Sequence, residues 1–354
     1  MRNFDYQQLL NKTWDTDIVN LIAKIHEFKS RESVFLQHQS EKLERLVDIA
    51  KIQSIESSNK IEGIITTNQR MKQLFRDKTT PKNRNEQEII GYRNVLNTIH
   101  ENYPYIALRP SYILQLHRDM LSKANISSAG QFKNVQNYIN ETQANGETIT
   151  RFIPLSPFET PQAIENLCFA YNQAIAKEQI DALILIPTFI IDFLCIHPFN
   201  DGNGRMSRLL SLLLLYQQGY NIGKYISLEK QIETTKDQYY DALYSSDRNW
   251  HENKNNPTPF IRYLLQIILS CYTELAQRMD SVEISSAKKL NSYQIVHQFV
   301  LTKIGKFTTA DILNNCPNIG RSSIIVALNK LVEEKIIIKQ GNGKNTFYIR
   351  NNDL

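Results

Sequence analysis

The chain has few of the residues that build cross-linked or membrane-spanning proteins. Its four cysteines lie far apart without a C-x-x-C pair, which excludes a disulfide framework and a structural zinc site and suits a reducing cytosol. No apolar run follows the first basic residue, so we expect no secretory signal and a cytoplasmic protein. The most apolar stretch, residues 182–196, is interrupted by Pro187 and Asp192 and is shorter than the ~18 residues of a membrane span, so it predicts a buried helix.

Glycine and net charge are also low. The 354 residues include 12 glycines, none before Gly63, and the net charge is only +5, too small to argue by itself for a nucleic-acid or membrane-surface protein. With 42% apolar and 22% charged residues, the composition is that of a globular protein. The length predicts two to three domains.

Helical periodicity dominates what is present. Apolar residues at three- and four-residue spacing predict an N-terminal helical region over residues 1–104 and a helical bundle over 105–280, with a short hairpin near 130–157. After a polar joint, residues 288–354 have the pattern of three helices and a hairpin, which predicts a winged helix-turn-helix domain. The predicted fold class is therefore mainly α.

A polar loop separates two of the most apolar helices. Residues 197–208 have the sequence H-P-F-N-D-G-N-G-R-M-S-R. Gly202 and Gly204 allow a tight turn and close approach of a ligand, and the amides that open the next helix attract anions. Arg205 and Arg208 are three residues apart, so we expect both guanidinium groups to project from one face onto phosphate oxygens. The loop predicts a polyphosphate site.

Two further residues of this loop offer chemistry. Asp201 has the hard oxygen that Mg²⁺ prefers when it bridges phosphates. His197 can accept a proton from an incoming hydroxyl. The bland alternative is a capped helix start with solvated arginines and a core histidine. A second Gly-Asn-Gly at 341–343, interpreted as a hairpin turn, shows that the triplet alone proves nothing, and no P-loop or dinucleotide fingerprint occurs.

The twelve-residue string resembles the signature of the Fic family, H-P-F-x-[DE]-G-N-G-R-x-x-R, and matches it at every specified position. Family enzymes are nucleotidyltransferases that move AMP from ATP to a Ser, Thr or Tyr hydroxyl of a protein. The resemblance implies His197 as the base, Asp201 as the Mg²⁺ ligand and Arg208 as the partner of the γ-phosphate, supported by Arg205. The nucleotide-binding residues it implies are Gly202, Asn203, Gly204, Arg205, Met206, Ser207 and Arg208, with Tyr239 and Tyr240 near the base and ribose.

A second motif resembles the family's built-in inhibitor, [ST]-x-x-x-E-[GN]. Ser58, Glu62 and Gly63 match it at the end of a helix predicted over about 43–63. The resemblance implies that Glu62 pairs with Arg208. This pairing occupies the arginine that would otherwise bind the γ-phosphate, so the resemblance implies a self-inhibited enzyme. From the residues alone, Ser58 and Glu62 share a helix face, and a solvated carboxylate near a helix end is the alternative.

The stretch Thr150, Arg151, Phe152 and Ile153 resembles the flap hairpin on which family members dock the target segment as an added strand. Its alternative is an ordinary surface hairpin, and the alternative for the tyrosine pair is a place in the core. The resemblance thus implies a Fic-type helical bundle with a small β-hairpin flap, and a homodimer is the family's habit.

The C-terminal region holds most of the surplus positive charge. Residues 288–354 contain ten basic and four acidic residues. The residues that suit a groove or phosphates are Arg321, Ser322, Ser323, Asn329, Lys339 and Lys344. DNA contact and a protein-contact or dimer surface both remain open. So do a DNA-binding regulator whose central domain senses nucleotide, a Fic enzyme with another nucleotide or a phosphocholine carrier as donor, and an enzyme that also removes AMP.

Overall fold

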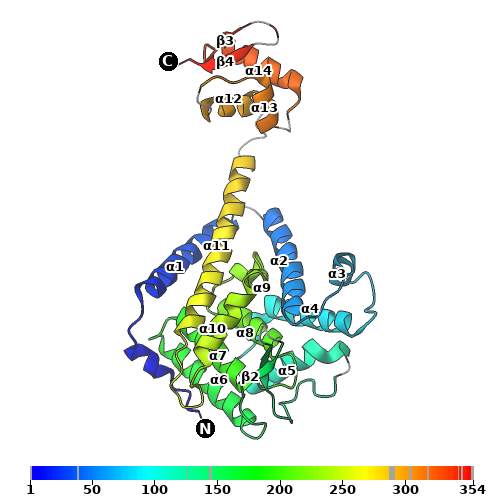
Figure 1. Ribbon diagram of the computed structural model, residues 1–354, viewed down its shortest axis with the longest axis vertical. Coiled ribbons are helices and arrows are strands. Elements are labelled where there is room, and N and C mark those ends of the chain that lie inside the picture. Colours follow the sequence, from blue (N-terminus) through cyan, green and yellow to red (C-terminus); the bar gives the residue numbers. More distant parts are fainter. Residues whose placement is uncertain are drawn as a thin grey trace. The chain divides into compact units, whose positions relative to one another are not determined.

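The computed structural model describes residues 2–37, 40–124, 126–142, 146–286, 292–302, 305–316, 319–341, 343 and 346–351. The chain divides into two compact units, Met1–Ala276 and Gln277–Leu354, which are treated separately here (Figure 1). Helices make up most of the described chain, and its strands form two small antiparallel pairs. The prediction of a mainly α fold is confirmed, whereas the domain limits at 104, 280 and 288 stay predictions.

The first unit is a helical assembly with one hairpin. Its α-helices are α1 (Thr16–Gln37), α2 (Ser40–Ile61), α3 (Asn68–Phe75), α4 (Arg84–Asn102), α5 (Pro110–Leu121), α6 (Thr160–Lys177), α7 (Ala182–Ile196), α8 (Asn203–Gln217), α9 (Leu228–Thr234), α10 (Lys236–Asp247) and α11 (Thr258–Ser286), which runs on into the second unit. Short 3₁₀ turns are η1 (Tyr6–Asn11), η2 (Tyr103–Tyr105), η3 (Ser122–Ala124) and η4 (Ile222–Lys224). The strands are β1 (Ile139–Thr142) and β2 (Thr148–Phe152).

Helices α7 and α8 form the centre of this unit (Figure 1). The Asp181 side chain caps α7 by accepting from the N–H of Leu183, and nearly every residue of α7 is buried, Pro187 included. Helix α8 is buried along almost its whole length because residues 209–216 are apolar or aromatic except for Ser211, whose hydroxyl donates to the carbonyl of Ser207 within the helix. A helix that is apolar on all sides must be surrounded by other helices. The polar turn between α7 and α8 is therefore held from both ends by the core.

The hairpin β1–β2 has the order and place expected for the predicted flap. Ile139 pairs with Phe152 and Thr142 with Thr148, with an irregular register between Ile139 and Asn140. Gly146 supplies the left-handed backbone of the turn with φ 82°, while Asn145, predicted to form the turn with it, lies outside the described residues.

The second unit contains three helices followed by an antiparallel pair. They are α12 (Ser292–Thr302), α13 (Thr309–Asn315), α14 (Arg321–Glu333), β3 (Ile337–Gln340) and β4 (Phe347–Arg350), in the predicted order. Its core includes Val296, Phe307, Leu328 and Tyr348. The winged-helix assignment itself stays a prediction, and Lys344 lies outside the described residues.

One core assignment in α14 is wrong. The apolar residues of this helix predict Ile324, Ile325 and Leu328 as core, but Ile325 is 43% exposed while the other two are fully buried. The buried positions 324, 327, 328 and 331 follow the three- and four-residue rhythm of a single helix face, and position 325 falls off that face.

No helix in the described part of the chain is both long and apolar enough to cross a bilayer.

Helices α4 and α5 approach each other closely at Gly91. A Cβ at this position would collide with the backbone carbonyl of Met120. We expect Gly91→Ala to lower the free energy of unfolding by about 1–3 kcal/mol, as overpacking does, although alanine favours a helix over glycine by roughly 1 kcal/mol. Urea denaturation measures this. Thr98→Ala, on the exposed side of α4, should change stability by less than about 0.5 kcal/mol. A Gly91→Ala protein more stable than the parent would contradict the packing argument.

Candidate active site

The turn between α7 and α8 is fixed by its own residues. His197 ends α7 with φ 52°, a left-handed conformation that costs roughly 1–2 kcal/mol for a residue with a Cβ. Gly202 has φ 83°, and a Cβ there would lie 2.8 Å from the Cε of Met120. The Asn203 amide accepts from the N–H of Phe199 at 2.9 Å and donates to the carbonyl of Phe199 at 2.7 Å. The side chain of Asn203 therefore closes the turn.

Two residues from outside the turn brace it. The His117 ring stacks on Phe199 with ring centroids 3.6 Å apart. Its Nδ1 accepts from the N–H of Gly130, so its Nε2 carries the proton and donates to the carbonyl of Asp201 at 3.0 Å. The Lys133 ammonium donates to the carbonyl of Ile196 at 2.9 Å, and burial lowers the pKa of this lysine to about 8. The sequence 116–120, Leu-His-Arg-Asp-Met, resembles the family but gives no role for His117, and no motif includes Lys133.

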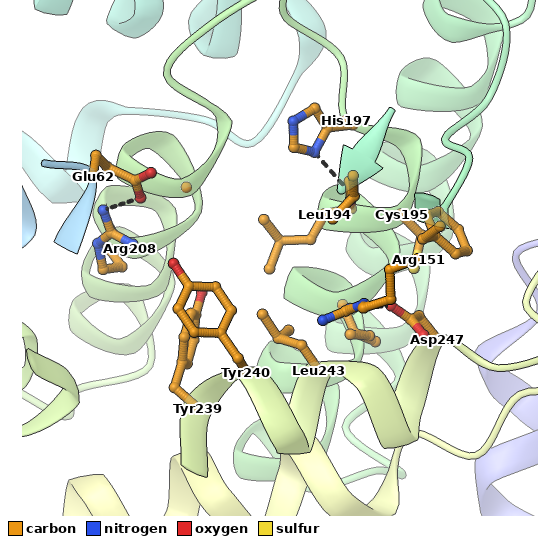
Figure 2. Close-up of a pocket in the computed structure, with 14 residues that line it drawn as sticks. Glu62, Arg151, Leu194, Cys195, His197, Arg208, Tyr239, Tyr240, Leu243 and Asp247 are labelled. Atoms are coloured by element: carbon orange, nitrogen blue, oxygen red, sulfur yellow. Dashed lines mark hydrogen bonds and ion pairs between the residues drawn. The ribbon is translucent and has the colours of Figure 1, made fainter. Parts of the chain in front are cut away.

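A cavity of about 140 Å³ lies beside the turn. Its walls come from α2, β1, β2, α7, α8 and α10, and Figure 2 shows the side chains around it. The lining residues are Glu62, Ile139, Arg151, Phe152, Ile191, Leu194, Cys195, His197, Gly204, Arg208, Tyr239, Tyr240, Leu243 and Asp247. Thus His197, Gly204, Arg208 and Glu62, which are far apart in the sequence, meet at one hollow.

Glu62 and Arg208 form an ion pair at one end of the cavity (Figure 2). The Arg208 guanidinium is 3% exposed and donates to the Glu62 carboxylate at 2.7 Å. It also donates to the hydroxyl of Ser58 at 2.8 Å and to the carbonyl of Ser58 at 2.9 Å. Arg208 therefore contacts Ser58 and Glu62, two of the three residues of the predicted inhibitory motif.

The charges of this pair stabilise each other. Burial alone would raise the pKa of Glu62, but the charge and hydrogen bond of Arg208 outweigh it and hold the pKa below its usual value. Burial alone would lower the pKa of Arg208, and the Glu62 carboxylate reverses the direction, so that the pKa is raised. Both groups are charged at neutral pH.

The Glu62 carboxylate also touches the start of α8. A Cβ added to Gly204 would collide with this carboxylate and would lie 3.4 Å from Nη1 of Arg208. The first turn of a helix attracts anions because its N–H groups have no partner within the helix. The absence of a side chain at Gly204 lets an anionic group reach that turn, and here Glu62 supplies the anion.

His197 faces the middle of the cavity. Its Nδ1 lies 3.3 Å from the carbonyl oxygen of Leu194, and Figure 2 shows the other ring nitrogen on the side toward Glu62 and Arg208. A proton on Nδ1, donated to Leu194, leaves Nε2 as the acceptor that faces the cavity. Burial lowers the pKa of His197 to about 4, so the ring is neutral at pH 7.

The prediction that Arg205 and Arg208 project together is wrong. Arg205 is 1% exposed, does not line the cavity, and points its Nη1 to Oε2 of Glu88 in α4 at 2.7 Å. Residues three apart on a helix differ by about 60° in direction. At this position the buried Glu88 carboxylate draws the guanidinium away from the cavity.

Other predicted nucleotide-binding residues shape α8 or line the cavity. Met206 is fully buried in the core, and the Ser207 hydroxyl donates to the carbonyl of Gly204 at 2.7 Å, so both side chains support the helix. Tyr239 and Tyr240 line the cavity, with ring centroids 5.3 Å apart. Tyr239 is buried, with 4% of its surface exposed, as the core alternative predicts, whereas Tyr240 is 38% exposed.

The predicted flap residues divide into two pairs. Arg151 and Phe152 reach the cavity, whereas Thr150 and Ile153 are exposed. Sequence analysis missed the partner of Arg151, because Asp247 carries no motif signal. The two side chains form an ion pair of 2.6 Å in which both are nearly buried, at the end of the cavity away from Glu62 (Figure 2). Burial raises the pKa of Asp247, and Arg151 opposes that shift.

Asp201 sits on the turn but does not line the cavity. Its carboxylate is half exposed, accepts from the N–H of Gly202 at 2.6 Å and lies 3.5 Å from Nη2 of Arg84. Among the described residues, no group of three or more His, Cys, Asp or Glu is arranged to hold a metal ion. An exposed single carboxylate still fits Mg²⁺, which keeps several waters and takes its other ligands from phosphates.

Comparison with known proteins gives one family. The sequence model of the Fic/DOC family matches residues 107–215. A Fido domain-containing protein of Dictyostelium discoideum is 31% identical over 102 residues, which are 28% of this chain and 67% of that protein. Protein adenylyltransferase fic-1 of Caenorhabditis elegans is 26% identical over 180 residues, 51% of this chain but only 30% of that protein, so the chain spans less than a third of this relative.

The fold has a counterpart among solved structures. A Fic family protein from Desulfovibrio desulfuricans G20 superposes with a TM-score of 0.63 at 19% identity, covering 97% of this chain and 98% of that one. At this level of identity the structural similarity shows a shared fold and nothing more.

The buried His197 predicts a shifted titration. We expect NMR of the His197 ring to give a pKa near the value of about 4, well below the ordinary 6.5. As pH falls, His197 is protonated in the unfolded chain before it is protonated in the folded chain. The free energy of unfolding should therefore fall as pH drops from 6.5 toward 4. His197→Gln assigns the resonance and should flatten this slope. A midpoint near 6.5 would mean that the ring is solvated.

Proposed function

Because the chain belongs to the Fic/DOC family, we propose that it is a protein adenylyltransferase that moves AMP from ATP to a Ser, Thr or Tyr hydroxyl and is inhibited by its own Glu62. The proposal rests on one observation: a neutral imidazole, a helix N-terminus and a buried arginine border a single cavity. The printed name of the nematode relative, protein adenylyltransferase, agrees with it.

The charge distribution supports one orientation of ATP. The positive end of α8 and Arg208 suit the triphosphate, while the apolar side chains of the cavity wall, Ile191, Leu194 and Leu243, suit the nucleoside. Tyr240 lies between the two ends (Figure 2). In this orientation His197 stands beside the innermost phosphate.

The transfer then needs one base. Nε2 of His197 takes the proton of the target hydroxyl as the hydroxyl oxygen attacks the α-phosphorus. The bond from this phosphorus to the bridging oxygen breaks, and pyrophosphate leaves. The lowered pKa keeps the imidazole neutral at pH 7, so its Nε2 is free to accept a proton. Arg208 and the α8 amides hold the departing phosphates.

Asp201 is the residue that would hold Mg²⁺. The ion would neutralise charge on the phosphates when bound. Arg84 and Arg205, whose Nη2 atoms lie 3.5 and 3.7 Å from the Asp201 carboxylate, orient it at the start of α8.

Inhibition follows from the contact of Glu62 with both Gly204 and Arg208. The carboxylate fills the position that the resemblance gives to the γ-phosphate, so ATP cannot seat its outer phosphate while Glu62 stays. A Glu62 carboxylate and a γ-phosphate bound to the same arginine would repel each other strongly. The bound nucleotide would then present its α-phosphorus to the target in a misaligned position.

The inhibitory helix is anchored along its length. Ser54 donates to Glu229 at 2.7 Å, Ser57 donates to Glu233 at 2.8 Å, and Lys60 pairs with Glu233 at 2.6 Å. Burial would raise the pKa of Glu233, but its hydrogen bonds with Lys230, Lys60 and Ser57 lower it to about 2. These contacts dock α2 on α9, so the inhibited arrangement is the resting one.

Removing Glu62 should activate the protein. With α-labelled ATP and Mg²⁺, we expect Glu62→Ala to raise self-labelling and target labelling about tenfold or more, which corresponds to roughly 1.4 kcal/mol. His197→Ala in the same background should lower the rate by about 10²- to 10⁴-fold, the usual contribution of a general base. Mass spectrometry should find a gain of one AMP.

The control is Glu56→Ala on the same helix, which should leave labelling at the level of the parent. Equal labelling by the parent and Glu62→Ala would remove the inhibitor from this proposal. A different mass gain would identify another donor, and loss of AMP from a labelled target would identify the reverse activity.

The second unit favours a further function, nucleic-acid contact. Arg321, Ser322 and Asn329 of α14 and Lys339 of β3 are exposed, as such a contact requires. Together with the basic surplus of this region, they make a phosphate-binding face our second proposal.

Salt dependence tests this face. We expect the full chain to bind a 20-base-pair duplex with a log–log salt slope that becomes shallower by about 2 when Arg321 and Lys339 are both replaced by alanine. Lys24→Ala, on α1, should leave the slope unchanged. Binding that does not depend on salt, or no binding, would point to a protein-contact surface instead.

A further inference from the structure

A buried carboxylate on α7 is held by two other segments of the first unit, and neither of them belongs to the Fic signature. Asp192 is 1% exposed. Its Oδ2 accepts from the hydroxyl of Tyr6 at 3.0 Å, and its Oδ1 accepts from the indole N–H of Trp250 at 2.7 Å and lies 3.0 Å from Nη2 of Arg2. A buried charge is retained only when it is paired and hydrogen-bonded, and these partners meet that condition.

Arg2 supplies the positive charge. Its Nη1 donates to the carbonyl of Trp250 at 2.7 Å, and its guanidinium lies 4.6 Å from the centre of the Trp250 ring. Other contacts hold the same segment, residues 2–12, in place: the N–H of Asn3 donates to Asn253, and the ammonium of Lys12 donates to Asn256. We call residues 2–12 the N-terminal arm.

Trp250 connects this cluster to the flap. Its ring packs edge-on against Phe152 of β2, with centroids 6.3 Å apart, and the neighbouring His251 ring stacks on Phe152 at 5.3 Å. His251 Nε2 lies 2.9 Å from the carbonyl oxygen of Ile153. Asp247, on the same stretch of chain, pairs with Arg151. The end of β2 is therefore attached to residues 247–251 by several contacts, and Trp250 in turn rests on Asp192 and Arg2.

These contacts lead to the cavity in two steps. Phe152 and Arg151 are part of its wall, and Phe152 packs against the tryptophan that Asp192 and Arg2 orient. Asp192 also lies on α7, the helix that ends at His197 and carries Leu194 and Cys195, which line the cavity as well. One buried charge cluster thus lies on the helix that ends at His197 and, through Trp250, contacts the strand that lines the cavity.

We propose that Arg2 is a positioning residue of the nucleotide site: by neutralising Asp192 and orienting Trp250, the N-terminal arm holds the β2 wall against the cavity. The inference rests on the proposed function insofar as ATP is the ligand of that cavity. Arg2 itself does not line the cavity, and it acts through Trp250 and Phe152. Loss of the Arg2 charge leaves Asp192 buried without a cation, and Trp250 loses the guanidinium that lies over its ring, while Asp192, the acceptor of its indole N–H, is no longer neutralised.

The test uses the full chain with Trp14→Phe, which leaves Trp250 as the sole tryptophan, and with Glu62→Ala to open the phosphate end. Arg2→Met removes the charge, Arg2→Lys keeps it without the planar fork, and Arg31→Met, whose parent side chain forms an exposed pair with Glu27, is the matched control. Amide hydrogen exchange of residues 148–152 without ligand, Trp250 emission, and titration with ATP are measured for each.

For Arg2→Met we expect faster exchange in residues 148–152 with unchanged exchange in α8, a shifted Trp250 emission, and about tenfold weaker ATP binding, within the range of coupling between contacting residues. Arg2→Lys should fall between Arg2→Met and the parent, and Arg31→Met should match the parent.

The same rate of exchange in β2 for Arg2→Met and the parent would overturn the inference. Equal ATP affinity despite a loosened β2, or loosening of α8 to the same extent, would also overturn it. If the parent binds no ATP, the adenylyltransferase proposal fails, and exchange in β2 alone then decides whether Arg2 positions this wall.

Discussion

The turn between α7 and α8 connects two helices that are buried on almost every side, and this constraint governs the rest of the site. Its backbone groups have little access to water, so protein groups must satisfy them. Asn203 closes the turn on Phe199, His117 holds the carbonyl of Asp201, and Lys133 holds the carbonyl of Ile196. The left-handed conformation of His197 is maintained by these contacts. A rigid turn of this kind keeps an imidazole and a helix N-terminus at a constant separation, as a reaction that depends on positioning requires.

The sequence predicted the parts of this site that are local and could not predict those that depend on distant partners. The twelve-residue string and Glu62 were recognisable because each is a short motif, and the structure brings Glu62, Arg208 and His197 to one cavity. Arg205 was assigned to the phosphates because spacing alone cannot reveal a buried carboxylate at Glu88. For the same reason the sequence suggested no partner for Asp247, Lys133 or Asp192, since their partners lie about sixty or more residues away. The helical class was predictable from periodicity, and the misassigned Ile325 shows that a run of apolar residues does not say which ones face inward.

The two ends of the cavity are controlled by different parts of the chain. Helix α2 brings Glu62 to the phosphate end and is fastened to α9 by Ser54, Ser57 and Lys60. Strand β2 forms the wall at the other end and is fastened to residues 247–251 and, through Trp250, to the N-terminal arm. In the proposed function the first end holds the phosphates and the second the nucleoside, so separate contacts hold the two ends, although both border the same imidazole.

The bare backbone at Gly204 has a consequence for how such a protein could be switched on. Glu62 is in van der Waals contact with this glycine as well as in an ion pair with Arg208, so it excludes a competing group by volume in addition to charge. Mobile ions weaken attraction between charges, but they do not shrink an atom. A rise in ionic strength would thus leave Glu62 in the space beside Gly204. Only a displacement of the end of α2, caused by a partner or a ligand that binds this helix, would empty that space.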